Sequence, residues 1–171
     1  MRTFLATFLL ITACQGSTGT PIASASPAAS SSPIQSQLTA PTAGPLVALP
    51  KGTVTIAGRA VAVDIAATAD SRRQGLSGRT SLAQDTGLVL GWTAPTAVSI
   101  WMPDMNFAID VIFVRNGSVL AVYPDVPPCV PGEPCPTFGP TLPVDFVLEV
   151  PAGNALALGV KIGSPASYKP N

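Results

Sequence analysis

Histidine is absent from this 171-residue chain, and charged residues are scarce. Without imidazole there is no Ser-His-Asp or Cys-His catalysis and no His-ligated zinc. Nine Lys and Arg residues balance nine Asp and Glu residues, so the formal net charge is zero. The only concentration of basic residues is Arg72, Arg73 and Arg79. Because nucleic-acid binding needs several convergent basic groups, we expect no nucleic-acid partner.

Cysteine is also rare, and the first of the three cysteines, Cys14, ends the segment Leu10-Ile11-Thr12-Ala13-Cys14. Arg2 and the apolar stretch Thr3–Ala13 precede it, and this stretch is shorter than the about 20 residues of a spanning helix. A basic start, a short apolar run and small residues before a cysteine are typical of a lipoprotein signal. The pattern predicts a signal peptide over residues 1–13 and a lipidated Cys14. The alternatives are an ordinary signal peptide or part of a transmembrane helix, with Cys14 incidental.

The segment that follows, Gln15–Pro50, has no charged residue and consists mainly of Ser, Thr, Ala, Pro and Gly. Such a composition cannot bury enough apolar surface to offset the entropy of ordering. Residues 14–50 are therefore predicted to form a disordered linker that tethers a domain to the membrane through the lipid. We expect an exported protein at the cell envelope, with its domain in the periplasmic or extracellular space. Gln15 after the cysteine favours the outer membrane in a cell that has one.

Residues 51–171 have the length of one domain with a single hydrophobic core. Apolar residues alternate with a period of two on both sides of Ala57-Gly58 and of Asn116-Gly117, which predicts two β-hairpins. Thr68 is a candidate cap for a short helix ending near Gly75, and residues 154–158 form a second helix candidate. Further strands are predicted over residues 87–90, 98–102 and 145–150. The sequence thus predicts an all-β fold, a compact single-domain sandwich or barrel with one or two short helices.

Cys129 and Cys135 flank a proline-rich segment that is predicted to be a loop rather than a central strand. In an oxidising compartment, two cysteines so close in the sequence are expected to form a disulfide. A metal site would need further ligands, and a redox-active pair would have the Cys-x-x-Cys spacing that is missing here. We therefore expect a structural disulfide and no cofactor.

The sequence contains, in this order, the motifs Arg72–Leu82, Gly87–Leu90, Ser99–Asp104, Ile109–Val114, Pro128-Cys129 with Cys135–Phe138, and Val147–Val150 with Ala152-Gly153 and Gly159–Gly163. Together these motifs resemble the uncharacterised family known as domain of unknown function 192. The resemblance implies a compact, mainly β domain and implies no particular biochemical role. The chain departs from the family pattern at Ser77, where Met is usual, and at Pro103-Asp104-Met105, where Lys-Asn-Thr is common.

The segment Trp101–Met105 suggests one candidate for a metal site. Met102 and Met105 are three residues apart beside Trp101, and thioethers are suitable ligands for Cu(I). The alternative interpretation is that Trp101 and Met102 pack at the end of a strand, because two thioethers are an incomplete ligand set.

The carboxylates Asp104 and Asp110 suggest a second candidate, an acid/base pair of a hydrolase acting on an envelope carbohydrate or ester. Asp110 interrupts an apolar run, so its side chain is expected to point inward and to require a partner. The available guanidinium partners are Arg72, Arg73 and Arg79. A binding cleft would bring Arg79, Trp101 and Asp110 together, whereas the alternative is a buried structural ion pair without function.

The function expected from the sequence is that of a lipid-anchored envelope protein. Its β domain is expected to bind a small ligand or another envelope component without catalysis, because the sequence has a signal and a spacer but no recognisable nucleophile or metal set. The hydrolase and Cu(I) hypotheses are the alternatives. No sequence feature points to a particular oligomeric state.

Overall fold

The computed structural model describes residues 48–171. The predicted signal peptide, Cys14 and the linker up to residue 47 lie outside the described residues. Within the described part of the chain, no helix combines the length and the hydropathy that crossing a bilayer would require.

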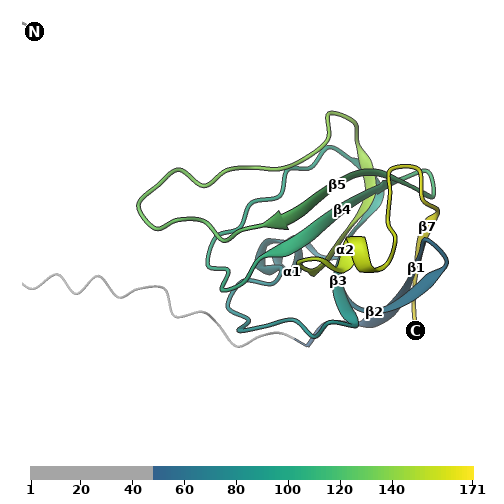
Figure 1. The fold of residues 1–171 in the computed structure, drawn as a ribbon, viewed down its shortest axis with the longest axis horizontal. Coiled ribbons are helices and arrows are strands. Elements are labelled where there is room, and N and C mark those ends of the chain that lie inside the picture. Colours follow the sequence, from purple (N-terminus) through teal and green to yellow (C-terminus); the bar gives the residue numbers. More distant parts are fainter. Residues whose placement is uncertain (1–47) are drawn as a thin grey trace, which may run out of the picture. The chain divides into compact units, whose positions relative to one another are not determined.

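The described residues form one seven-stranded sheet with two short helices (Figure 1). The sheet order is β5-β4-β6-β3-β2-β1-β7, in which β2 and β3 are parallel and all other neighbours are antiparallel. The elements are β1 (Lys51–Ile56), β2 (Arg59–Ala66), α1 (Ala69–Gln74), β3 (Thr86–Thr96), β4 (Ile109–Arg115), β5 (Ser118–Val126), β6 (Val144–Pro151), α2 (Asn154–Ala157) and β7 (Ala166–Pro170).

Both predicted hairpins are present, and each turns on two residues with positive φ. Ala57 and Gly58 have φ of 48° and 77°, and Asn116 and Gly117 have φ of 49° and 72°. Positive φ at both central positions is the requirement of a type I′ turn, whose twist matches that of the strands. These turns place β1 beside β2 and β4 beside β5.

The sheet curls so that its first and last strands approach each other at one end. Val119 in β5 accepts a hydrogen bond from Gly163 and donates one to Ser164, just before β7. One buried cluster contains residues from all seven strands, among them Val54, Ile65, Val89, Ile112, Val119, Phe146 and Ala166. The expected mainly β, single-domain fold is confirmed, and it takes the form of a curled, barrel-like sheet around this inner cluster.

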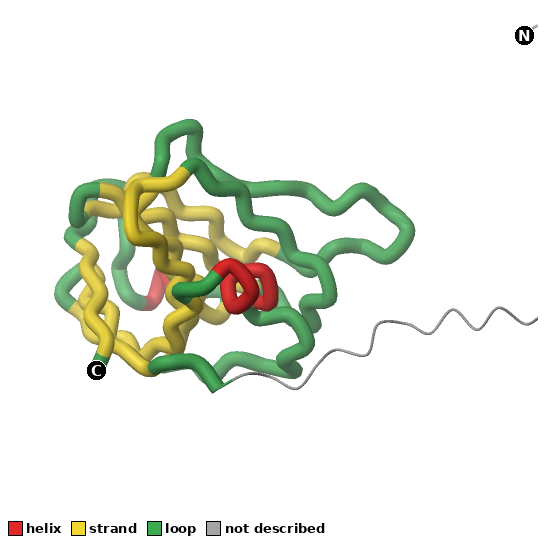
Figure 2. Tube along the Cα trace, turned by 180° about the vertical axis from the view of Figure 1, so that it is seen from behind, coloured by secondary structure: helices red, strands yellow, loops and turns green. Residues whose placement is uncertain are grey.

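A second buried cluster lies on the outer face of the sheet and includes Leu76, Leu88, Met102, Val111 and Val147. Parallel strands such as β2 and β3 need a crossover connection between them. This connection contains α1 and Leu76, and it covers part of the cluster. Thr68 caps α1 and accepts a hydrogen bond from Ser71, and the helix ends before Gly75, as predicted. Figure 2 shows α1 in front of the strands, whereas α2 contributes Ala155 to the inner cluster.

Two elements differ from the sequence-based expectation. Residues 98–102 were expected to form a strand, but they make only an isolated bridge between Ile100 and Phe138. Their apolar side chains pack onto the outer face of the sheet instead of entering its ladder. Strand β7 is the second difference, because the sequence does not predict it. Its five residues include Pro170, and they form a strand only by pairing with β1.

Candidate functional site

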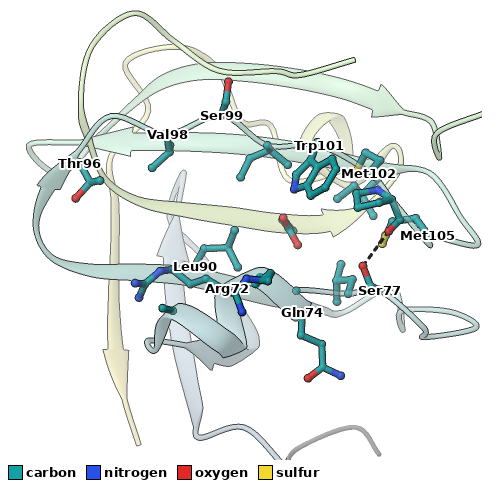
Figure 3. Close-up of a pocket in the computed structure, with 18 of the residues that line it drawn as sticks. Arg72, Gln74, Ser77, Leu90, Thr96, Val98, Ser99, Trp101, Met102 and Met105 are labelled. Atoms are coloured by element: carbon teal, nitrogen blue, oxygen red, sulfur yellow. Dashed lines mark hydrogen bonds between the residues drawn. The ribbon is translucent and has the colours of Figure 1, made fainter. Parts of the chain in front are cut away.

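A cavity of about 400 Å³ lies on the outer face of the sheet (Figure 3). One wall is formed by α1 and the residues just after it, the other by the segment 96–105, and the floor by β3 and β6. Its lining is mostly apolar and includes Leu76, Leu90, Trp92, Ile100 and Trp101. A cavity of this size and composition, with a few polar groups, is typical of a small-molecule site.

Glu149 is the only carboxylate among the cavity-lining residues. It lies in the central strand β6 opposite Leu88 and Val111, and it is only 5% exposed. Burial raises the pKa of its carboxyl group from 4.5 to about 7, and the positive charge of Arg79 partly opposes this shift. Within residues 48–171 no residue donates a hydrogen bond to the carboxyl group, which is therefore open to a partner, either water or a ligand, from the cavity that it lines.

The wall formed by α1 carries the cationic groups of the cavity. Nη1 of Arg72 donates to the carbonyl oxygens of Ala67 and Gly91, and the guanidinium lies 5.0 Å from the ring centroid of Trp92. Arg73 forms an exposed ion pair with Asp70 at 2.9 Å. Arg72 is therefore fixed by carbonyl groups and an aromatic ring, without a carboxylate partner in the described part of the chain.

The opposite wall presents one aromatic ring and two thioethers. Trp101 is 55% exposed, Met102 is buried in the outer cluster, and Met105 packs against that cluster. All three line the cavity, and Figure 3 shows them on the side facing α1. Met102 packs as the alternative interpretation expected, whereas Trp101 is exposed and no strand ends at these residues, and Cu(I) binding stays a prediction.

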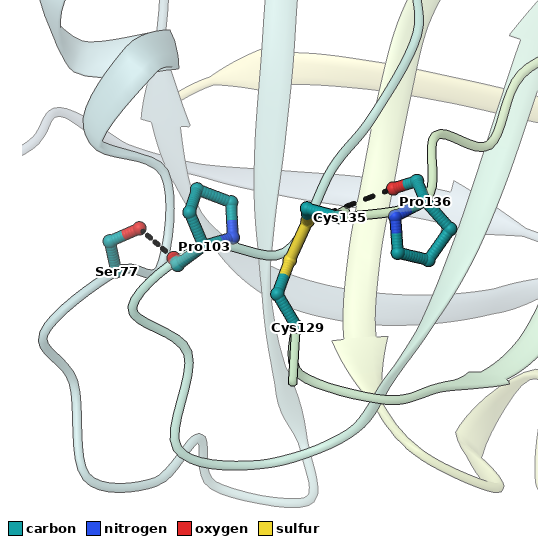
Figure 4. Close-up of a disulfide and its surroundings, with 5 residues drawn as sticks. All are labelled: Ser77, Pro103, Cys129, Cys135 and Pro136. Carbon is teal, nitrogen blue, oxygen red and sulfur yellow. Dashed lines mark hydrogen bonds between the residues drawn. A yellow bond between two sulfur atoms is a disulfide. The ribbon is translucent and has the colours of Figure 1, made fainter. Parts of the chain in front are cut away.

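Hydrogen bonds join the two walls at one end of the cavity. The Ser77 hydroxyl donates to the Pro103 carbonyl at 2.9 Å, and the Gly78 amide donates to the Asp104 carbonyl at 3.1 Å. Ser77 and Pro103 are both positions at which the chain departs from the family pattern. The two departures are thus in direct contact (Figure 4), and both residues line the cavity.

Cys129 and Cys135 form the predicted disulfide, with their Cα atoms 5.1 Å apart (Figure 4). The Cys129 amide donates to the Met102 carbonyl at 3.0 Å. The disulfide loop is therefore attached to the wall that carries Trp101 and Met102, and it supports the cavity from outside.

Asp110 lies on the inner face, away from the cavity lining. It is fully buried, as the sequence pattern predicted, but its partners are backbone amides rather than an arginine. Its carboxylate accepts hydrogen bonds from Asp125, Gly153 and Ala155 at 2.9, 3.1 and 2.8 Å. Because Gly153 has no side chain to cap α2, Asp110 supplies the cap from another strand.

The structure does not bring Arg79, Trp101 and Asp110 together, in contrast to the cleft expected from the sequence. Arg79 pairs with Asp64 at 2.8 Å and lines a second cavity, and only Trp101 lines the cavity described above. The physical reason is strand alternation, which turns Asp110 to the inner face while Glu149 points to the outer face. Asp104 is exposed and Asp110 is fully buried, so they do not form an acid/base pair in one site.

Glu149 is the site residue that the sequence interpretation missed. It interrupts the apolar run of β6 just as Asp110 interrupts that of β4. The same signal was therefore available, but only the register of three strands shows that Glu149 faces a cavity.

Together these features define a small, barrel-like β domain with a ligand-sized cavity on its outer face. The model of the family called domain of unknown function 192, described as an uncharacterized ACR, matches residues 52–168, and the chain belongs to this family. No curated protein matches the chain.

Two solved structures are similar to this chain. One is a candidate transcription regulator from Sinorhizobium meliloti 1021, with 26% identity and a TM-score of 0.63 over 72% of this chain and 97% of that one. The other is a protein of unknown function from Novosphingobium aromaticivorans, with 26% identity and a TM-score of 0.60 over 76% of this chain and 94% of that one.

Proposed function

We propose that the domain binds a small ligand in the cavity between α1 and the segment 96–105, without catalysis. The observation that carries the proposal is Glu149, a buried carboxyl group that lines the cavity and makes no hydrogen bond within residues 48–171. A buried polar group is costly unless it finds a partner, and no described residue donates a hydrogen bond to this carboxyl group, which leaves a ligand or water in the cavity to supply one. The exposed indole of Trp101 adds an apolar contact surface to the lining of the same cavity.

We further propose that this domain acts at the cell envelope as a lipoprotein. The support is in the sequence alone: a basic start, a short apolar run ending at Cys14, and an uncharged linker. A lipidated Cys14 would restrict the ligands to molecules within reach of a membrane-tethered domain.

A role in transcription, suggested by the description of the Sinorhizobium meliloti protein, has little support in this chain. Of the three arginines that form its basic concentration, Arg73 pairs with Asp70 and Arg79 with Asp64, so within residues 48–171 only Arg72 has no carboxylate partner. A DNA-binding surface would need several basic groups free to reach phosphates.

The binding proposal is tested by titrating the full chain with benzyl alcohol and benzylamine and following backbone amide chemical shifts. We expect the largest shifts at residues 76–77, 101–102 and 149. Trp101→Ala should weaken binding, whereas Leu156→Ala should leave it unchanged, because Leu156 is 86% exposed on α2 and does not line the cavity. Equal weakening by both variants, or shifts confined to other regions, would contradict the proposal.

A further inference from the structure

The polar groups of the cavity indicate the chemistry of its ligand, an inference that rests on the proposed binding function. Glu149 is the only carboxyl group on the lining, and its neighbours across the sheet, Leu88 and Val111, are apolar. No described group donates a hydrogen bond to it. A carboxylate in such surroundings is stabilised most by a donor that also carries a positive charge, because hydrogen bonds between ionised groups are the stronger ones.

The wall beside Glu149 suits a cation better than most apolar surfaces do. Trp101 lines the cavity with an exposed indole ring, an aromatic group that attracts positive charge through its face. Met102 and Met105 add polarizable sulfur atoms that adapt to the shape of a ligand. Figure 3 shows these three side chains along the same wall.

Arg72 supplies the complementary group on the α1 wall. Both of its hydrogen bonds use Nη1, which donates to Ala67 and Gly91. Its Nε and Nη2 groups make no hydrogen bond within residues 48–171, and Arg72 lines the cavity. A ligand reaching from Glu149 to Arg72 would therefore meet an acceptor at one end and donors at the other.

We propose that the cavity takes a small organic amine that also carries a hydrogen-bond acceptor such as a carboxylate. Its ammonium group donates to Glu149, its acceptor group binds Arg72, and its apolar part packs against Trp101 and Met102.

This arrangement makes binding depend on pH through Glu149. The charged groups around it are Arg79, whose field reaches the carboxyl group, and Arg72 and Arg73 on the cavity wall, while the adjacent strands contribute apolar residues. An ammonium group pairs with the ionised form, so binding an amine displaces a proton from Glu149. Affinity for an amine should consequently rise between about pH 6 and about pH 8.

The test uses the full chain and the fluorescence of its two tryptophans, both of which line the cavity. The probes are para-aminomethylbenzoate, benzylamine, benzyl alcohol and para-methylbenzoate. At about pH 8 we expect para-aminomethylbenzoate to bind most tightly, and benzylamine to bind at least about tenfold more tightly than benzyl alcohol. Glu149→Gln should abolish the higher affinity for benzylamine than for benzyl alcohol. Arg72→Gln should abolish the higher affinity for para-aminomethylbenzoate than for benzylamine. The exposed control Glu133→Gln should change neither.

The possible failures are distinguishable. If benzyl alcohol binds as tightly as benzylamine in the wild type, or if the preference for the amine persists in Glu149→Gln, the amine inference is overturned and the proposed binding function stands. If para-methylbenzoate is the tightest ligand and tightens at lower pH, the cavity binds an anion and the inference is again overturned. If no probe binds, both proposals fail.

Discussion

Two buried carboxyl groups in adjacent strands illustrate how the surroundings determine the role of a residue. Asp110 in β4 accepts three backbone hydrogen bonds and holds the start of α2. Glu149 in β6 makes no hydrogen bond within residues 48–171 and lines a cavity. Strand alternation and register place these acidic residues on opposite faces of one sheet. The first carboxyl group is structural, and the second lines the cavity that we propose as the binding site.

The raised pKa of Glu149 predicts that the wild type loses stability as pH rises. Glu149 has a pKa of 4.5 in the unfolded state and about 7 in the folded state. Its contribution to stability is therefore complete below pH 4.5 and is lost as the pH rises through about 7. The free energy of unfolding should fall by about 3 kcal/mol over this window. Glu149→Gln should remove most of this fall, as measured by urea unfolding at several pH values. An equal fall in the variant would show that other groups cause it.

Asp110→Ala should be strongly destabilising, because it leaves three buried backbone amides without an acceptor. We expect a loss of about 3 kcal/mol or more in the free energy of unfolding. Asp104→Ala is the matched control, since Asp104 is exposed, and it should change stability by less than about 0.5 kcal/mol. Amide hydrogen exchange of α2 should rise selectively in Asp110→Ala at any pH where the variant is folded. Unchanged protection of α2 would contradict the capping role.

At the scale of elements, the layer that covers the outer face of the sheet consists mainly of connections between strands. The β2–β3 crossover, the segment 96–105 and the disulfide loop are joined by a few hydrogen bonds, such as Ser77 to Pro103 and Cys129 to Met102. These contacts hold the two walls of the cavity at a fixed separation. Most of the residues that make these contacts lie outside regular secondary structure. Each wall is therefore held in place largely by its contacts with the other.

Loss of the disulfide is expected to act on stability and on the cavity wall together. Replacing Cys129 and Cys135 by Ala should lower the free energy of unfolding by about 2 to 3 kcal/mol, because the loop closed by the disulfide is short. The amides of residues 101–105 should exchange faster with solvent, since Cys129 donates to Met102. Those in β1 and β2, on the other side of the sheet, should show only the global change. Faster exchange of β1 and β2 beyond that change would argue against a local role for the loop.

Elements encoded by local signals were predictable from the sequence. The dipeptides Ala57-Gly58 and Asn116-Gly117 fix two turns, and Thr68 with Gly75 bounds α1. Strand β7 and the parallel pairing of β2 with β3 have no such signal, because their order comes from partners distant in the sequence. The same holds for residues 98–102, whose apolar pattern fits a strand as well as it fits a segment packed on a sheet.

At the scale of the whole molecule, our proposals place location and binding in separate parts of the chain. Cys14→Ala is expected to release or mislocalise the protein while leaving the domain folded. Membrane fractionation and mass spectrometry of the mature N-terminus provide the measurement, with the Cys129→Ala variant as a control that should weaken the domain without moving it. An unmodified N-terminus downstream of Cys14 in the wild type would rule the anchor out.

The sequence by itself determined the family, the mainly β fold, the hairpin turns and the disulfide pair, because each depends on residues close together in the chain or on the order of motifs. Only the tertiary structure decided which carboxyl group lines a cavity. Glu149, Trp101 and Arg72 belong to three separate segments, and the cavity they share exists only after the crossover and the loops have packed on the outer face of the sheet.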